Sequence, residues 1–319
     1  MRRGPLRAEG LLLLAAAIWG FSFVAQRAGM AHVGPLLFNG VRFALGAAVL
    51  VPVWWWRGRR PNGAGTLAAG VTVGIVLFVA AALQQAGLVY TTAGRAGFIT
   101  GLYVVLVPVV VVAWGRRVGA PAWAGVTLAT IGLYLLSVDV SFGIGLGDML
   151  VLASAFGWTC HVLLVDRFTS RIDAISFAIV QFTVCSALSL AAALVFERGH
   201  PVDLAAATIP VLYGGVMSVG VAYTLQVLGQ RNAPPTAAAL LLSTESLFAA
   251  LGGAVLLGET LDRRALAGCA FMLAGVVVSQ LFAPSTPLHA GVGAVEQEQP
   301  PEELAGSCDE SQGPGASDL

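Results

Sequence analysis

The chain has 319 residues, of which 57% are hydrophobic and 11% are charged, and its formal net charge is zero. Its mean hydropathy is +0.83, so its polar residues are too few to coat the surface of an ordinary soluble domain. The composition therefore excludes such a domain and favours a protein that crosses a membrane.

Apolar runs long enough to cross a bilayer follow one another along the chain. A helix needs about 20 residues to cross a hydrocarbon core of about 30 Å. Lipid offers no hydrogen bonds to an open backbone, so each run is predicted to be a helix. In chain order, we expect ten membrane-spanning helices at about 10–28, 34–55, 66–88, 95–114, 121–138, 147–165, 174–196, 207–229, 235–257 and 264–283.

The two ends of the chain need separate interpretation. Arg2, Arg3 and Arg7 precede the first run, as in a signal peptide, but the apolar stretch continues through Phe23 and further runs follow. We therefore expect the first run to be a retained span. Residues 284–319 carry acidic residues and no lysine or arginine, and they are predicted to form a disordered, acidic cytoplasmic tail.

Similar residues recur at nearly constant offsets in the two halves of the chain. The offset rises from 139 to 143 along the sequence, as short loop insertions would produce. The clearest pairs are Trp19 and Trp158, Gln84 and Gln226, Gly125 and Gly268, and Gly132 and Gly275. The chain is therefore predicted to hold two copies of a five-helix unit, residues 8–140 and 147–283.

An odd number of spans per copy determines how the copies relate. The second copy must enter the membrane upside down, so the copies are related by a pseudo-two-fold axis in the membrane plane. We therefore expect an all-α polytopic membrane protein of ten transmembrane helices in two inverted five-helix repeats, with a cavity where the repeats meet. Repeats of this kind are typical of transporters that expose a central cavity to alternate sides.

Arginine supplies every basic side chain, because the chain has no lysine. If the N-terminus lies inside, eleven arginines fall in inner segments and five in outer ones. Inner loops of membrane proteins are enriched in positive charge. We therefore expect a multi-pass protein of the bacterial inner membrane with both termini in the cytoplasm. The absence of lysine also excludes a Walker-type phosphate loop.

Two charged residues fall within spans. Arg42 lies in the second span and Glu245 near the middle of the ninth. An arginine at a helix centre costs roughly 2.5–3.5 kcal/mol on insertion scales, so each residue is expected to face the protein interior. Two interpretations stay open: an ion pair that locks the repeats together, or side chains that line the transport path. Glu245 is also the candidate for proton coupling, since no other acid lies so deep in a span.

Polar and aromatic side chains in other spans complete the candidate site. Tyr223 and Gln226 share one helix face, and the repeat favours Gln84 and Gln226, although helix packing alone could explain them. The candidate cavity residues are Trp19, Phe23, Arg42, Gln84, Tyr103, Trp158, His161, Tyr223, Gln226 and Glu245. The cysteines lie singly, so neither a metal site nor a disulfide framework is expected, and no cofactor is implied.

The order of these features resembles the EamA branch of the drug/metabolite transporter superfamily. The resemblance rests on Trp19-Gly20, Arg42-Phe43, Glu245 and the Leu-Gly-Glu-Thr-Leu motif at 257–261, and it covers about residues 8–283. Many members have Glu-Pro in the ninth span, whereas Ser246 follows Glu245 here. The resemblance implies export of amino acids and other metabolites, or drug efflux, while eukaryotic relatives carry nucleotide sugars and sugar phosphates.

These observations together predict a secondary exporter of small metabolites, such as amino acids or related amphipathic compounds. The alternatives are an exchanger of nucleotide sugars or sugar phosphates, a drug efflux carrier and, with less support, an intramembrane enzyme or a channel. Neither a His-Glu-x-x-His nor a Gly-x-Ser-x-Gly motif occurs, so no enzymatic activity is expected. The expected partners are a small-molecule substrate and the lipid bilayer, not nucleic acid, and both a monomer and a homodimer remain open.

Overall fold

Helices account for all the regular structure of the described chain, which contains no strand. The computed structural model describes residues 3–58, 63–91, 93–137, 145–169, 172–200, 202–257 and 263–281. These residues belong to one compact unit, Met1–Pro284. The predicted tail at 284–319 and most of the motif at 257–261 lie outside the described residues.

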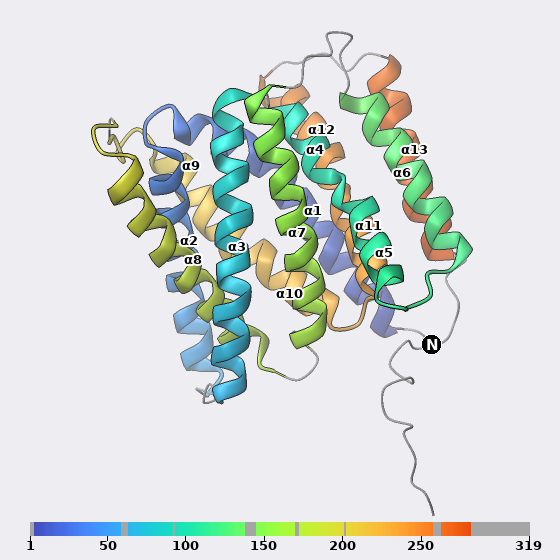
Figure 1. Cartoon of the computed structure of the whole chain (residues 1–319), viewed down its shortest axis with the longest axis horizontal. Coiled ribbons are helices and arrows are strands. Elements are labelled where there is room, and N and C mark those ends of the chain that lie inside the picture. The colour runs from blue at the N-terminus through green and yellow to red at the C-terminus, as the bar shows by residue number, and fades with distance from the viewer. Residues whose placement is uncertain are drawn as a thin grey trace, which may run out of the picture. The chain divides into compact units, whose positions relative to one another are not determined.

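The described helices make ten passes (Figure 1). The first five are α1 (Arg3–Met30), α2 (Pro35–Trp56), α3 (Ala64–Tyr90), α4 (Ala93–Gly101) with α5 (Tyr103–Ala113), and α6 (Ala120–Ser137). The second five are α7 (Leu146–Thr169), α8 (Ala174–Phe196), α9 (Thr208–Leu212) with the π-helix η1 (Tyr213–Tyr223) and α10 (Thr224–Gln230), α11 (Pro235–Ser243) with α12 (Glu245–Leu257), and α13 (Arg263–Leu281).

Most of these passes are long and apolar enough to cross a bilayer. Among the described residues, eight meet this criterion by length and composition, α6 is a shorter apolar helix, and α13 packs along α6. The prediction of an all-α polytopic protein is confirmed. We call the side at which α1 begins the N-terminal face, and the side at which α1 ends the distal face.

The contact between α6 and α13 shows that the repeats are inverted. A Cβ on Gly125 would lie 2.7 Å from the carbonyl oxygen of Gly275, and one on Gly132 would lie 2.6 Å from that of Gly268. The helices are thus antiparallel and almost touching. Gly125 corresponds to Gly268, and Gly132 corresponds to Gly275, each 143 positions later. The repeat relation therefore converts the first contact into the second. A two-fold axis that relates antiparallel helices is perpendicular to them, so it lies in the membrane plane.

A second pair of close contacts obeys the same symmetry. Where α3 meets α7, a Cβ on Gly87 would lie 2.6 Å from the Val151 side chain. Where α10 meets α1, a Cβ on Gly229 would lie 2.7 Å from the Leu12 side chain. Gly87 and Gly229 are 142 positions apart, and Leu12 and Val151 are 139 apart. Each repeat therefore packs its third pass against the first pass of the other repeat.

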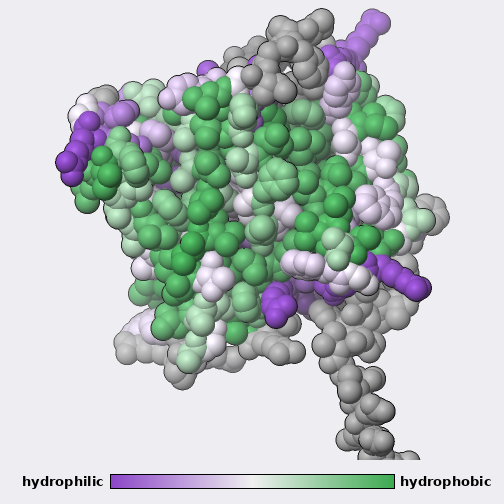
Figure 2. Space-filling view, viewed as in Figure 1, coloured by the Kyte–Doolittle hydropathy of each residue, from purple (hydrophilic) through white to green (hydrophobic). Residues whose placement is uncertain are grey.

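The helices at the edges of the bundle also pair across the repeats. Figure 1 shows α6 beside α13 at one edge and α2 beside α8 at the other. In Figure 2, apolar residues cover the middle of the visible face, and hydrophilic residues gather toward its ends. Large apolar side chains such as Val79, Leu194 and Leu273 are exposed on the protein surface, as lipid contact requires.

Three passes are less regular than the predicted continuous helices. The fourth pass is divided at Leu102 and the ninth at Thr244, 142 positions later, while the eighth contains η1. In the ninth pass, the Ser243 and Thr244 hydroxyls donate to the carbonyl oxygens three residues earlier, at 2.8 and 2.6 Å. Such bonds compete with the helical ladder and bend it. In the fourth pass, Gly101 precedes the break.

Candidate functional site

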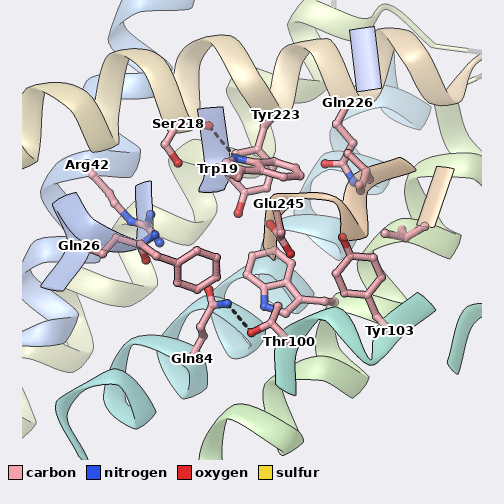
Figure 3. A pocket seen from close by; sticks show the side chains of 14 residues that line it. Trp19, Gln26, Arg42, Gln84, Thr100, Tyr103, Ser218, Tyr223, Gln226 and Glu245 are labelled. Carbon is pink, nitrogen blue, oxygen red and sulfur yellow. Dashed lines mark hydrogen bonds between the residues drawn. The ribbon is translucent and has the colours of Figure 1, made fainter. Parts of the chain in front are cut away.

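A cavity lies between the two repeats (Figure 3). The space that protein atoms leave free in it, including any opening to solvent, is about 480 Å³. Passes one to four of the first repeat and passes six, eight and nine contribute to its wall. The lining residues are Trp19, Phe23, Gln26, Arg42, Gln84, Thr100, Tyr103, Trp158, Val162, Ser218, Tyr223, Gln226, Leu242 and Glu245.

Most of this wall consists of pairs of equivalent residues. Five pairs are related by the same offsets, 139 or 142, that relate the repeats. The pairs are Trp19 and Trp158, Phe23 and Val162, Gln84 and Gln226, Thr100 and Leu242, and Tyr103 and Glu245. The cavity therefore lies on the pseudo-two-fold axis. Four lining residues have no equivalent in the wall: Gln26, Arg42, Ser218 and Tyr223. Of these, Gln26 and Arg42 lie toward the distal ends of α1 and α2.

The helix breaks place two polar side chains at the cavity. Tyr103 is the first residue of α5 and Glu245 the first of α12. Both side chains point toward the space between the helices in Figure 3, and the Glu245 carboxyl group interacts with the Tyr103 hydroxyl. A Cβ on Gly20 would lie 2.6 Å from the Glu245 carbonyl oxygen. Gly20 thus permits α1 to pass close to the start of α12.

Arg42 is held by neighbours on its own helix. Its Nε donates a 2.9 Å hydrogen bond to Asn39 Oδ1, and the Asn39 amide donates at 3.0 Å to the Ala81 carbonyl oxygen. The guanidinium also lies 4.9 Å from the centre of the Phe43 ring, a cation–π contact. These contacts fix the side chain while its end reaches the cavity.

Arg42 and Glu245 line the same cavity without forming an ion pair. The ion pairs found among the described residues join Arg95 to Asp148 at 3.0 Å and Arg116 to Asp166 at 3.7 Å. Arg42 is 2% exposed and Glu245 is 5% exposed. The contacts therefore do not support a direct Arg42–Glu245 lock.

Further hydrogen bonds hold the polar wall. The Gln84 amide donates to the Thr100 hydroxyl at 2.9 Å, and the Trp19 indole donates to the Ser218 carbonyl oxygen at 3.1 Å (Figure 3). Ser218 lies within η1, and π-helical segments occur frequently at functional sites. The oxygen of Gln226 has no partner among the described groups, so the cavity offers a free acceptor there.

Tyr223 is the centre of an aromatic cluster beside the cavity. Its ring centre lies 4.6 Å from that of Trp19, 6.2 Å from that of Trp158 and 5.9 Å from that of His161. It also lies 5.7 Å from Phe182 and 5.9 Å from Phe43, the phenylalanines that the repeat relates. Tyr223 therefore contacts both repeats at their junction.

Nine of the ten predicted candidates line the cavity, and His161 does not. The His161 ring lies behind Trp158 and Tyr223, and its Nε2 is 3.2 Å from Gln181 Oε1. That these residues bind substrate stays a prediction. The prediction omitted five lining residues: Gln26, Thr100, Val162, Ser218 and Leu242. Helical spacing from Trp19 and Phe23 would have indicated Gln26, and the repeat offset from Phe23 would have indicated Val162.

Comparison with known proteins identifies the family. The EamA-like transporter family matches residues 6–138 and 145–281, one match in each half. The chain belongs to this family. Among its relatives, an "Uncharacterized transporter" of Archaeoglobus fulgidus is 28% identical over 278 residues, covering 85% of this chain and 84% of its own length. A "Probable amino-acid metabolite efflux pump" of Salmonella typhimurium is 29% identical, covering 86% of this chain and 95% of its own.

The fold of this EamA-like transporter has also been seen experimentally. A crystal structure with 22% sequence identity superposes with a TM-score of 0.73, covering 86% of this chain and 97% of the other. That similarity shows the fold alone. Together with the apolar helices, the family match shows that the chain is a multi-pass membrane transporter. Among the described residues, no group of three His, Cys, Asp or Glu is placed to hold a metal ion.

Proposed function

We propose that this transporter exports small zwitterionic metabolites of the amino-acid class by alternating access. The observation that carries the proposal is the symmetric wall of the cavity, with a broken helix from each repeat beside it. In transporters built from inverted repeats, substrate sites lie at the repeat interface near the midplane and use discontinuous helices. Rocking one repeat against the other then opens the cavity to either face.

The charges in the cavity suit a substrate with both an ammonium and a carboxylate. Arginine binds carboxylates through charge-assisted hydrogen bonds, and Arg42 has no acidic partner among the described ion pairs. Glu245 offers a carboxyl group to an ammonium. The two residues come from different repeats, so such a substrate would bridge them. The printed names of the Salmonella and Escherichia coli relatives, amino-acid metabolite efflux pumps, support the same class.

Orientation and energy source are proposed from features of the sequence. We propose that the N-terminal face is cytoplasmic, on the arginine bias of the short loops, and that the protein resides in the bacterial inner membrane. The chain contains no Walker motif, so an ion gradient or the gradient of the substrate itself drives export. We assign it no enzymatic activity, on the transporter family and the absence of hydrolase motifs.

Counterflow in proteoliposomes tests this proposal. Liposomes loaded with unlabelled amino acids should accumulate an external labelled amino acid transiently, because a carrier exchanges substrate across the membrane. A channel would show no such trans-stimulation. Candidate substrates come from comparing the medium of cells that overexpress the chain with that of control cells. Arg42 also suits phosphate, so the same assay is repeated with sugar phosphates. Exchange of sugar phosphates without exchange of amino acids would overturn the amino-acid assignment.

A further inference from the structure

His161 and Gln181 form a polar pair outside the cavity whose bonding is incomplete. Both side chains are 0% exposed. His161 Nε2 is 3.2 Å from Gln181 Oε1, but His161 Nδ1 and Gln181 Nε2 have no hydrogen-bond partner. Buried polar atoms are almost always bonded, and each exception calls for an explanation. One explanation is that a ligand supplies the missing partners in another state of the protein.

The repeat relates this pair to the distal part of the cavity. Gln181 lies 139 positions after Arg42, and His161 lies 139 positions after Ser22. Arg42 lines the cavity, and the Ser22 hydroxyl accepts a 3.0 Å hydrogen bond from the lining residue Gln26. Because the repeats are inverted, His161 and Gln181 occupy the equivalent place on the side of the N-terminal face.

One residue makes the two sides different. Tyr223 lies 142 positions after Ala81, so a phenol ring occupies a site where the first repeat has a methyl group. Ala81 accepts the hydrogen bond of Asn39, beside Arg42. Tyr223 instead packs against His161 and Phe182 at ring-centre distances of 5.9 and 5.7 Å. The Tyr223 ring therefore packs over His161, whereas Arg42, the equivalent of Gln181, reaches the cavity.

We propose that His161 and Gln181 are a second substrate subsite, closed by Tyr223 in this structure and open to the N-terminal face in the opposite state. Before the repeats rock, the distal part of the cavity binds the substrate. After they have rocked, the subsite binds it. Trp158 and Tyr223 contact both His161 and the cavity, so displacement of the Tyr223 ring joins the two spaces. This inference rests on the proposed transport function.

The unpartnered atoms indicate what the subsite binds. If His161 Nε2–H donates to Gln181 Oε1, the neutral ring leaves Nδ1 as an acceptor, and Gln181 Nε2 remains a donor. A ligand that carries a donor next to an acceptor satisfies both atoms. The ammonium and carboxylate of a zwitterionic amino acid have this arrangement. The subsite holds no net charge of its own, so it releases such a ligand more readily than a site built around Arg42.

Thiol labelling tests the proposal in proteoliposomes. The test variant is Gln181→Cys in a chain whose Cys160, Cys185, Cys269 and Cys308 are replaced by serine, and the probe is a hydrophilic methanethiosulfonate. Adding Tyr223→Ala should increase the labelling rate about tenfold, as a population shift of 1.4 kcal/mol would. The control is Ser189→Cys in the same background. Ser189 is also 0% exposed, two turns along the same helix, and its labelling should not change.

A second measurement tests the proposal without the Tyr223→Ala substitution, in case that variant fails to fold. With Tyr223 intact, amino-acid exchange should accelerate labelling of Gln181→Cys, and of His161→Cys, but not of Ser189→Cys. If the chain exchanges amino acids while both test positions stay unlabelled, the subsite is wrong and the transport function stands. Equal acceleration at Ser189→Cys would also overturn the subsite, because it would indicate general loosening. Absence of exchange in the wild-type chain would overturn the transport function itself.

Discussion

Arg42 and Glu245 line one cavity from opposite repeats, and no ion pair joins them. A buried ion pair would have locked the repeats and left little charge for a substrate. Instead, the guanidinium is held by Asn39 and the ring of Phe43, and the carboxyl group interacts with Tyr103. Both side chains are therefore kept in place by groups other than each other.

The first prediction follows from this separation. Arg42→Met and Glu245→Gln should each weaken amino-acid exchange about 10- to 100-fold, because a hydrogen bond to a charged group contributes about 1.5–3 kcal/mol. Initial rates of exchange over a range of substrate concentrations measure the effect. In the double variant, stability should not recover relative to the single variants. Recovery of the melting temperature would show that the two residues stabilise each other, against the observed geometry.

The second prediction concerns coupling to protons. Glu245 is 5% exposed at the start of α12 and has no basic partner among the described ion pairs. If its carboxyl group carries the proton, Glu245→Gln should abolish the acceleration of export by a pH gradient, while the weakened exchange at equal pH remains measurable. Uptake is measured in liposomes with and without the gradient. Export by the variant that remains fully driven by the gradient would exclude coupling at this residue.

The third prediction tests the crossing of α6 and α13. Gly125→Ala should destabilise the protein by about 1–3 kcal/mol, the usual cost of overpacking, because the new methyl group would meet the Gly275 backbone. Gly65→Ala is the matched control, since nothing lies within 4 Å of a Cβ at that position. Thermal unfolding in detergent compares the two variants. An equal melting temperature for both would argue against the close crossing.

The fourth prediction concerns the break in the ninth pass. Thr244→Val removes the hydroxyl that donates to Leu241 and should favour a continuous helix, slowing exchange more than it changes stability. Thr183→Val is the control, because that hydroxyl makes a similar bond to Ile179 on an exposed part of α8. Exchange rate and melting temperature are measured for both. Equal exchange by the two variants would mean that the break has no part in transport.

Sequence patterns predicted an all-α chain of ten passes, because apolar length largely decides whether a segment spans a bilayer. Among the described residues, eight helices are long and apolar enough to do so. The offsets between Gly125 and Gly268 and between Gln84 and Gln226 predicted the repeat, and an odd number of spans predicted its inversion. They did not predict the breaks at Leu102 and Thr244 or the π-helix. These depend on local competition between side-chain and backbone hydrogen bonds, which apolar periodicity does not report.

The candidate site was also predictable from the sequence only in part. That Arg42 and Glu245 face the protein interior could be predicted, because burying a charged side chain in lipid is costly, and both line the cavity. Ser218 was missed because it contributes a backbone carbonyl to the Trp19 indole, and Leu242 because it is one leucine among many. The position of His161 behind Tyr223 depended on ring packing between spans six and eight, which residue spacing within one helix does not reveal.

The most direct test of alternating access measures distances at the two faces by pulsed electron paramagnetic resonance. One spin-label pair replaces Tyr90 and Ile209, exposed residues at the distal ends of passes three and eight, and the other replaces their repeat equivalents Asn232 and Leu67 near the N-terminal face. Under exchange conditions, one distance should lengthen while the other shortens. Two distances that stay fixed, or change in the same direction, while the labelled chains exchange amino acids would contradict the account.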